Sequence, residues 1–162
     1  MYGVNSNEFL YLMPGHMYFG KEQPGVKTLL GSCIAVTLWH PYKLVGGMCH
    51  ITLPGTNPKD MNPKYAYGAI NTFLKEIAAH QTRPQDYITQ IYGGGKMTSV
   101  DDSPSMRDIG NKNAWKTLEL LAHNKFRLSH MDILDTKYRH IEMNLHTGRV
   151  ICKATDVSKT MG

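Results

Sequence analysis

The sequence is poor in cysteine and has no long hydrophobic run. Its 162 residues contain three cysteines, Cys33, Cys49 and Cys152, an odd number with no pairing pattern. We therefore expect free thiols, as in a reducing compartment, rather than a disulfide framework. No apolar run approaches the roughly 18 residues of a membrane span, and residues 1–9 lack the basic start and apolar core of a signal peptide. These absences predict a cytoplasmic protein that does not insert into membranes.

Charge is also sparse and is not clustered. Charged residues make up 19% of the chain and hydrophobic residues 41%, as in ordinary globular proteins, and the length suits one domain over residues 1–162. The net charge of +5 would attract an anionic partner. However, the Lys and Arg residues are scattered without a basic run, which favours a solvated surface and predicts no nucleic-acid partner.

Periodicity along the chain predicts an α+β fold. Amphipathic patterns predict helices over residues 64–80 and 112–123. Their predicted buried stripes are Tyr65, Ala69, Phe73 and Ile77 in the first and Trp115, Leu118, Leu121 and Ala122 in the second. Strand patterns occur at residues 33–39, 45–53, 87–92, 128–134, 141–145 and 150–153. The first 25 residues are expected to be peripheral, with a polar loop at 18–23, and residues 156–162 to form a mobile tail.

The first two of these strands are expected to bring a thiol and an imidazole together. Strands 33–39 and 45–53 flank a turn at residues 40–43, where a proline suits the turn conformation. A turn centred near the Pro-Tyr pair places Cys33 opposite His50 in an antiparallel pair. Directly opposed residues share a face of the sheet, with Cβ atoms roughly 4.5–5.5 Å apart.

A paired cysteine and histidine form the basis of a cysteine-nucleophile site. Gly31 and Ser32 precede Cys33, so the chain can bend there and expose the thiol. The backbone N–H groups around these three residues would then face a developing oxyanion. An imidazolium at His50 would lower the thiol pKa. From spacing alone, a buried thiol beside a hydrogen-bonded histidine is an open alternative.

Other kinds of site are less well supported by the residues. A zinc site would draw on Cys33, Cys49, Cys152 and His50, but Cys49 and His50 are neighbours that point to opposite faces of a strand, and no C-x₂-C pair is present. We therefore predict no metal, and expect Cys49 to face the core. Gly93-Gly94-Gly95 precedes Lys-Met rather than the GKS/T end of a phosphate-binding loop. This pattern favours a tight strand exit beside the site and no cofactor.

The segments around the Cys-His pair resemble those of a known family. LLGSCIAVTL at residues 29–38, followed by GGMCHITLP at 46–54, is similar to the signature of the chemoreceptor glutamine deamidase family (CheD). IYGGGKM at 91–97 and IGNKN at 109–113 resemble two further segments of that family, and the resemblance extends from about residue 25 to 153. It implies a single-domain fold, a mixed or antiparallel β-sheet sandwich flanked by helices.

The resemblance also implies roles for individual residues. It makes Cys33 the nucleophile and His50 the general base of a thioester mechanism, with Thr28 as the third catalytic group. The implied substrates are selected glutamines of chemotaxis receptors, which are converted to glutamate with release of ammonia. Some family members also bind a CheC-type phosphatase. One departure concerns substrate choice: the chain has Leu134-Asp135-Thr136-Lys137-Tyr138 in the loop where family members generally have a Gly-Gly pair.

Two other functions fit the same residues. One is a chemotaxis adaptor that binds receptors or a CheC-type phosphatase, with catalysis minor or lost. The other is a papain-like protease, which shares the Cys-His pair and requires a peptide-binding groove. Retention of both Cys33 and His50 favours the deamidase.

Overall fold

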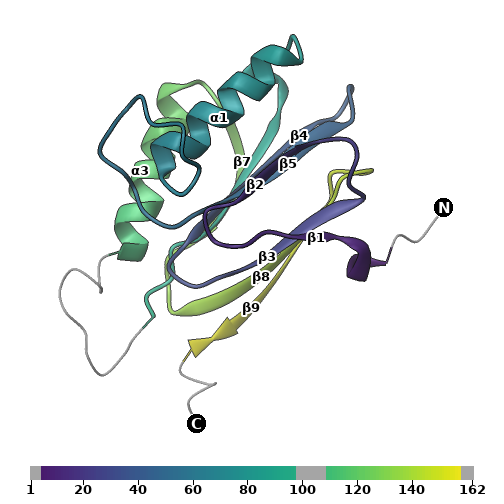
Figure 1. The fold of residues 1–162 in the computed structure, drawn as a ribbon. Coiled ribbons are helices and arrows are strands. Elements are labelled where there is room, and N and C mark those ends of the chain that lie inside the picture. Colours follow the sequence, from purple (N-terminus) through teal and green to yellow (C-terminus); the bar gives the residue numbers. More distant parts are fainter. Residues whose placement is uncertain (1–4, 98–108, 158–162) are drawn as a thin grey trace.

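Two mixed β-sheets lie face to face, and two α-helices cover the outer face of one of them in the described part of the chain, residues 5–97 and 109–157 of the computed structural model (Figure 1). One sheet has the order β1 (Leu10–Tyr11), β3 (Gly25–Leu30), β8 (Lys137–Asn144), β9 (Val150–Asp156). The other has the order β2 (Met17–Gly20), β5 (Val45–Ile51), β4 (Ile34–His40), β6 (Ile88–Gly93), β7 (Arg127–Ile133). The helices are α1 (Ala66–Ala79) and α3 (Ile109–His123), and the 3₁₀ turns are η1 (Ser6–Glu8) and η2 (Pro84–Asp86). The predicted α+β sandwich flanked by helices is confirmed.

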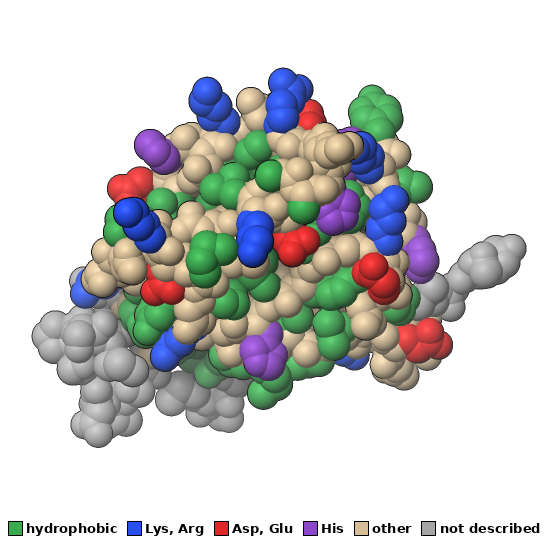
Figure 2. Space-filling view, turned by 45° about the horizontal axis from the view of Figure 1, so that its top comes forward, with side chains coloured by type: hydrophobic (Ala, Val, Ile, Leu, Met, Phe, Trp, Pro, Cys, Tyr) green, Lys and Arg blue, Asp and Glu red, His purple; other side chains and the backbone are tan. Residues whose placement is uncertain are grey.

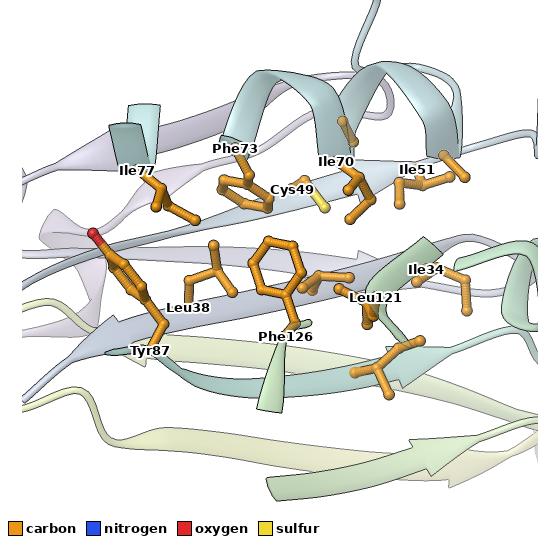
Figure 3. Packing of buried hydrophobic residues seen from close by; sticks show 14 of the residues in the cluster. Ile34, Leu38, Cys49, Ile51, Ile70, Phe73, Ile77, Tyr87, Leu121 and Phe126 are labelled. Atoms are coloured by element: carbon orange, nitrogen blue, oxygen red, sulfur yellow. The ribbon is translucent and has the colours of Figure 1, made fainter. Parts of the chain in front are cut away.

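The hairpin of β4 and β5 lies at the centre of the fold and is buried on both faces. Every residue of the two strands is buried, because one face packs under the helices and the other on the second sheet. Ile34, Leu38 and Cys49 belong to the cluster below α1, which Figure 3 shows at close range. Ala35 and Met48 belong to the cluster between the sheets. Burial on both faces explains the nearly continuous apolar sequence of these strands, and the predicted direction of Cys49 is confirmed.

The N-terminal segment contributes a strand to each sheet. β1 pairs in parallel with β3, and β2 pairs antiparallel with β5. The first 25 residues thus contribute the edge strands of both sheets. The polar loop predicted at 18–23 is wrong for residues 18–20, because Met17–Gly20 forms β2. These two strands are short, and pairing with long neighbours stabilises them although their own patterns are weak.

The C-terminal hairpin runs further than predicted. β8 begins at Lys137, and β9 continues to Asp156. The next residue, Val157, is buried. The mobile tail predicted for 156–162 is thus wrong for its first two residues, and residues 158–162 lie outside the described part of the chain. None of the helices in the described part is long and apolar enough to span a membrane.

Helix α3 buries only part of its predicted apolar stripe, Leu121 with Leu118 partly buried, and adds small and polar side chains. Trp115 is 60% exposed and Ala122 is also exposed, whereas the buried residues are Gly110, Asn113, Ala114, Thr117 and Leu121. The helix is turned so that its first turn packs closely on the glycines after β6. An ideal Cβ on Gly110 would lie 2.6 Å from the Gly94 carbonyl oxygen and 2.7 Å from that of Gly95. This close approach selects the buried face of the helix.

The turn between β7 and β8 has a conformation that favours glycine. Leu134 and Asp135 have φ angles of 67° and 68°, in the left-handed region. They begin the segment 134–138, where the resemblance leads us to expect a Gly-Gly pair. The turn is held by neighbouring groups, since the Arg139 guanidinium donates to the Leu134 carbonyl (2.8 Å) and the Lys96 N–H donates to that of Asp135 (2.7 Å). It borders a pocket of about 200 Å³ that also includes Gly94.

We predict that Gly110→Ala destabilises the protein by about 1–3 kcal/mol, because the added methyl group would overlap two backbone oxygens. A loss of stability would be informative, because replacing glycine by alanine within a helix normally stabilises the helix by about 1 kcal/mol. Urea unfolding would measure the change. The matched control is Asn111→Ala at the exposed neighbouring position, expected to stay within about 0.5 kcal/mol of the parent. Equal stability of Gly110→Ala and the parent would contradict the close packing.

Candidate active site

Cys33 and His50 share a face of the central hairpin but are not directly opposed. His50 faces Ala35, and Cys33 lies two residues from Ala35, just before β4 begins. The turn contains four residues, 41–44, between the paired His40 and Val45, so its centre lies later than predicted. The expected direct opposition is therefore wrong by two positions, while the shared face is confirmed. Diagonal neighbours of this kind lie roughly 7–8 Å apart at the backbone, within reach of long side chains.

The His50 ring is oriented by a hydroxyl from the other sheet. His50 on β5 is 2% exposed, and its Nδ1 lies 2.7 Å from Oγ1 of Thr28 on β3. The Thr28 hydroxyl is also 2.8 Å from the Leu12 carbonyl oxygen. A carbonyl oxygen only accepts, so the single Thr28 hydrogen is donated to Leu12. The His50 Nδ1–H must then donate to Thr28 Oγ1, which assigns the tautomer with an unprotonated Nε2.

The other ring nitrogen of His50, Nε2, is buried, unprotonated and without a hydrogen-bond partner among the described residues. Burial lowers the pKa of His50 to about 4, and the neighbouring His16 contributes in the same direction. At neutral pH the imidazole is therefore uncharged, with a free lone pair on Nε2.

The thiol of Cys33 is also uncharged at neutral pH. Cys33 is partly buried and packs at the edge of the cluster between the sheets. Burial raises its pKa above the ordinary value. Burial of both groups therefore favours a neutral Cys33 thiol and a neutral His50 imidazole over a thiolate–imidazolium pair.

The backbone around Cys33 is held by the glycines after β6. The Gly95 N–H donates to the Gly31 carbonyl (2.9 Å), and the Gly94 N–H donates to the Cys33 carbonyl (2.9 Å). Because a trans peptide points its N–H opposite to its carbonyl, the Ser32 N–H points away from the glycine segment. The sequence-based prediction of a tight strand exit next to the nucleophile agrees with these contacts.

Two groups at this site have no role in the sequence-based prediction. The Leu12 carbonyl is a backbone group, so no side-chain pattern indicates it. The Asn113 side-chain amide donates to the carbonyl oxygens of Ser32 (3.1 Å) and Thr52 (3.0 Å). Asn113 ends the IGNKN segment noted in the sequence, which was the available signal.

The remaining cysteines occupy different environments. Cys49 is fully buried under α1 (Figure 3), and burial raises its pKa to about 12. Cys152 on β9 is partly buried, with Sγ 3.7 Å from an Asp132 carboxylate oxygen and a pKa raised to about 11, mainly by burial. Within residues 5–97 and 109–157, no cluster of three or more His, Cys, Asp or Glu is placed to hold a metal ion.

Comparison with known proteins identifies the family. The family described as CheD chemotactic sensory transduction matches residues 52–154, more than half of the chain. The chain belongs to the CheD family. The matched segment contains Asn113 and the glycines after β6, whereas Thr28, Cys33 and His50 precede it.

Curated CheD proteins are similar over most of the chain. A probable chemoreceptor glutamine deamidase CheD of Pseudomonas syringae pv. syringae is 34% identical over 87% of this chain and 81% of its own length. Relatives with the same description from Dechloromonas aromatica (34%, 87% of this chain, 84% of the relative) and Leptospira interrogans (33%, 87% and 89%) are similarly close. Among solved structures, Bacillus licheniformis YfiH, a hypothetical protein, has a TM-score of 0.48 and 12% identity, over 74% of this chain and 51% of its own.

We predict that His50 makes folding stability rise with pH between about 4 and 6.5. The unfolded histidine has a pKa near 6.5 and the folded one about 4, so the unfolded state binds more protons in this window. The contribution is complete above the unfolded pKa and is lost as the pH falls toward 4, on the order of 3 kcal/mol in total. Urea midpoints at pH 4.5 and 7.5 would measure it.

The control for this pH dependence compares two histidine variants. His50→Gln should flatten the difference between the two pH values, while His16→Gln at the exposed neighbour should keep most of it. An unchanged pH dependence in His50→Gln would show that His50 is not buried as a neutral group.

Proposed function

We propose that this chain is a protein-glutamine deamidase that converts selected glutamines of chemotaxis receptors to glutamate and ammonia. Its curated CheD relatives are described as probable chemoreceptor glutamine deamidases. The observation that carries the proposal is the Thr28–His50 hydrogen bond, which leaves Nε2 unprotonated on the face that also bears Cys33. This is the arrangement that a cysteine nucleophile with a general base requires.

The first half of the reaction forms a thioester. Nε2 of His50 accepts the Sγ proton as Cys33 attacks the side-chain carbonyl carbon of glutamine. Negative charge develops on the amide oxygen, and backbone N–H groups of Ser32 and Cys33 stabilise it. The C–N bond then breaks as His50 Nε2–H gives its proton to the leaving nitrogen. Ammonia departs, and the acyl group stays on Cys33.

The second half hydrolyses the thioester. Water takes the place left by ammonia, and His50 Nε2 accepts its proton as the oxygen attacks the acyl carbon. The C–S bond breaks, and the departing sulfur takes up a proton from Nε2–H. The product is glutamate, and Cys33 and His50 return to their neutral states. One base therefore serves both acyl-transfer steps.

Thr28 acts through His50 rather than on substrate. It accepts the Nδ1–H and so holds the productive tautomer and ring orientation, as the third member of a nucleophile–base triad does. Unlike a carboxylate, a hydroxyl carries no charge to stabilise the imidazolium formed during the reaction. The low pKa of His50, about 4, is consistent with this neutral partner.

We place the reaction in the cytoplasm, on receptor helices. The basic charge of +5 favours acidic partners. Figure 2 shows Lys and Arg side chains spread over one face among acidic and neutral ones, without a single basic patch on that side. We therefore infer that charge assists the encounter, while the site selects the glutamine. A CheC-type phosphatase is a further partner that the family membership suggests.

We predict that Cys33→Ala abolishes deamidation while the fold is retained. The assay is mass spectrometry of a purified chemoreceptor cytoplasmic domain from the same organism, since each deamidated glutamine gains about 1 Da through the acyl-transfer sequence above. Cys152→Ala, at another partly buried thiol, is the matched control and should keep the activity. Deamidation by Cys33→Ala would disprove the mechanism. Full chemotaxis with Cys33→Ala in place of the parent would support the adaptor function instead.

We predict that Thr28→Val lowers kcat by about 10- to 100-fold, because His50 loses the acceptor that holds its tautomer. Thr28→Ser keeps a hydroxyl and should restore most of the rate. ¹⁵N NMR of histidine-labelled protein would follow the tautomer directly, with the Nδ1–H form dominant in the parent and depleted in Thr28→Val. A full rate in Thr28→Val would remove Thr28 from the mechanism.

A further inference from the structure

Asn113 joins the chain just before β4, where Cys33 lies, to the chain just after β5, the strand of His50. It lies on α3 and is fully buried. Its Nδ2 donates one hydrogen to the Ser32 carbonyl (3.1 Å) and the other to the Thr52 carbonyl (3.0 Å). These partners are 81 and 61 residues away along the chain, so one amide connects three distant segments.

The direction of this amide is determined by its partners. Both are carbonyl oxygens, which only accept hydrogen bonds, so the Asn113 nitrogen must face them and its oxygen must point away. That oxygen, Oδ1, is buried and has no hydrogen-bond partner among the described residues. Burying an unpaired amide oxygen is unfavourable. An apolar residue would avoid this cost, so the two donated bonds are the feature that favours asparagine here.

The two carbonyls lie where β4 and β5 separate. The last paired residues of the ladder on this side are Ile34 and Ile51. Ser32 and Thr52 lie just beyond this pair, and we call Ser32, Cys33 and Thr52 the strand fork. Beyond the Ile34–Ile51 pair the strands no longer pair with each other, and the Asn113 amide bridges Ser32 and Thr52 instead. The separation of the strand ends, and with it that of Cys33 from His50, depends on this bridge.

The bridge also orients the peptide that precedes the nucleophile. The Ser32 carbonyl points at Asn113, and in a trans peptide the Cys33 N–H must point the opposite way. The next peptide is held by the Gly94 N–H on the Cys33 carbonyl (2.9 Å). Both peptide planes beside the Cys33 Cα are thus held by neighbours, which leaves the side-chain torsion as the main freedom of the thiol.

We propose that Asn113 is a positioning residue for the deamidase, which sets the thiol against His50 Nε2 and aims the Cys33 N–H at the developing oxyanion. This inference rests on the proposed function. It assigns Asn113 no contact with substrate; the residue acts through the strand fork.

The test compares Asn113→Ala with Thr117→Val. Thr117 is also fully buried on α3, one turn further along, and its hydroxyl donates to the backbone carbonyl of Asn113 (2.8 Å) within the helix. Thr117→Val therefore disturbs the same helix without removing a bond to the strand fork. Thermal unfolding midpoints of both variants would show that any difference in rate is not a difference in folding.

The first measurement is steady-state deamidation of the purified receptor cytoplasmic domain. Asn113→Ala should lower kcat by about 10- to 100-fold, as expected for misplacement of reacting groups by about an ångström, while KM stays within about threefold. Thr117→Val should change neither by more than about twofold. A kcat within threefold of the parent in folded Asn113→Ala, or an equal loss in Thr117→Val, would overturn the proposal.

The second measurement needs no receptor. Iodoacetamide alkylation of Cys33, followed by peptide mass spectrometry, is measured in the parent, Asn113→Ala, His50→Gln and the double variant. His50→Gln should slow alkylation several-fold in the parent and have little effect in Asn113→Ala, because the thiol no longer sits against Nε2. An equal effect of His50→Gln in both backgrounds would overturn the proposal.

The two measurements distinguish failure of the proposed deamidase function from failure of the positioning role of Asn113. If the parent does not deamidate the receptor, the proposed function fails, and the alkylation cycle still decides whether Asn113 positions Cys33. If Asn113→Ala does not fold, Asn113→Ser replaces it in both measurements. Its hydroxyl can donate to no more than one carbonyl of the fork, so its kcat should lie below that of the parent. A kcat equal to that of the parent would overturn the proposal.

Discussion

The hydrogen bond between Thr28 and His50 joins the two sheets, and the rest of the site depends on it. Thr28 belongs to β3 of the four-stranded sheet and His50 to β5 of the five-stranded sheet. A distance of 2.7 Å between their side chains requires the sheets to stack at one separation and in one register. The cluster between the sheets, which includes Val26, Leu30 and Met48, sets that separation. Hydrophobic packing therefore determines the position of the base, and its free energy offsets the cost of an unpartnered buried Nε2.

Backbone groups of the N-terminal segment, residues 12–16, hold both Thr28 and His50 in place. The His50 carbonyl accepts from the Gly15 N–H (2.9 Å), and the His50 N–H donates to the His16 carbonyl (3.0 Å). A few residues earlier, the Leu12 carbonyl accepts the Thr28 hydroxyl. One short stretch of backbone thus holds both members of the inter-sheet hydrogen bond. A segment with a weak sequence pattern is part of the candidate active site because its contribution comes from main-chain groups.

Alternation along a strand was enough to place Cys33 and His50 on one face and Cys49 on the other, because side chains in a strand alternate whatever the exact register. The register itself depended on turn length, and a turn of four residues moved the partner of His50 from Cys33 to Ala35.

The buried face of helix α3 could not be predicted from hydrophobic periodicity alone. Hydrophobic periodicity selected Trp115, whereas the sheet accepts the face with Gly110 and Asn113, because close backbone contact and two donated hydrogen bonds outweigh apolar area there. Such contacts depend on the distant segments that meet the helix, so a local pattern cannot reveal them.

In the proposed deamidase, a neutral Cys33–His50 pair suits a weak electrophile such as a carboxamide. A thiolate at rest is open to oxidation and to adventitious electrophiles, whereas a thiol with a raised pKa is comparatively inert. A carboxamide reacts only when the nucleophile and its base act together and the oxyanion is stabilised at the same time. In this structure the base is in the correct tautomer, and the peptides around the thiol are held before substrate arrives. Reactivity then arises from the encounter with a correctly placed amide rather than from a permanently activated sulfur. In that reaction the chemical restraint of the pair at rest follows from the burial of both groups.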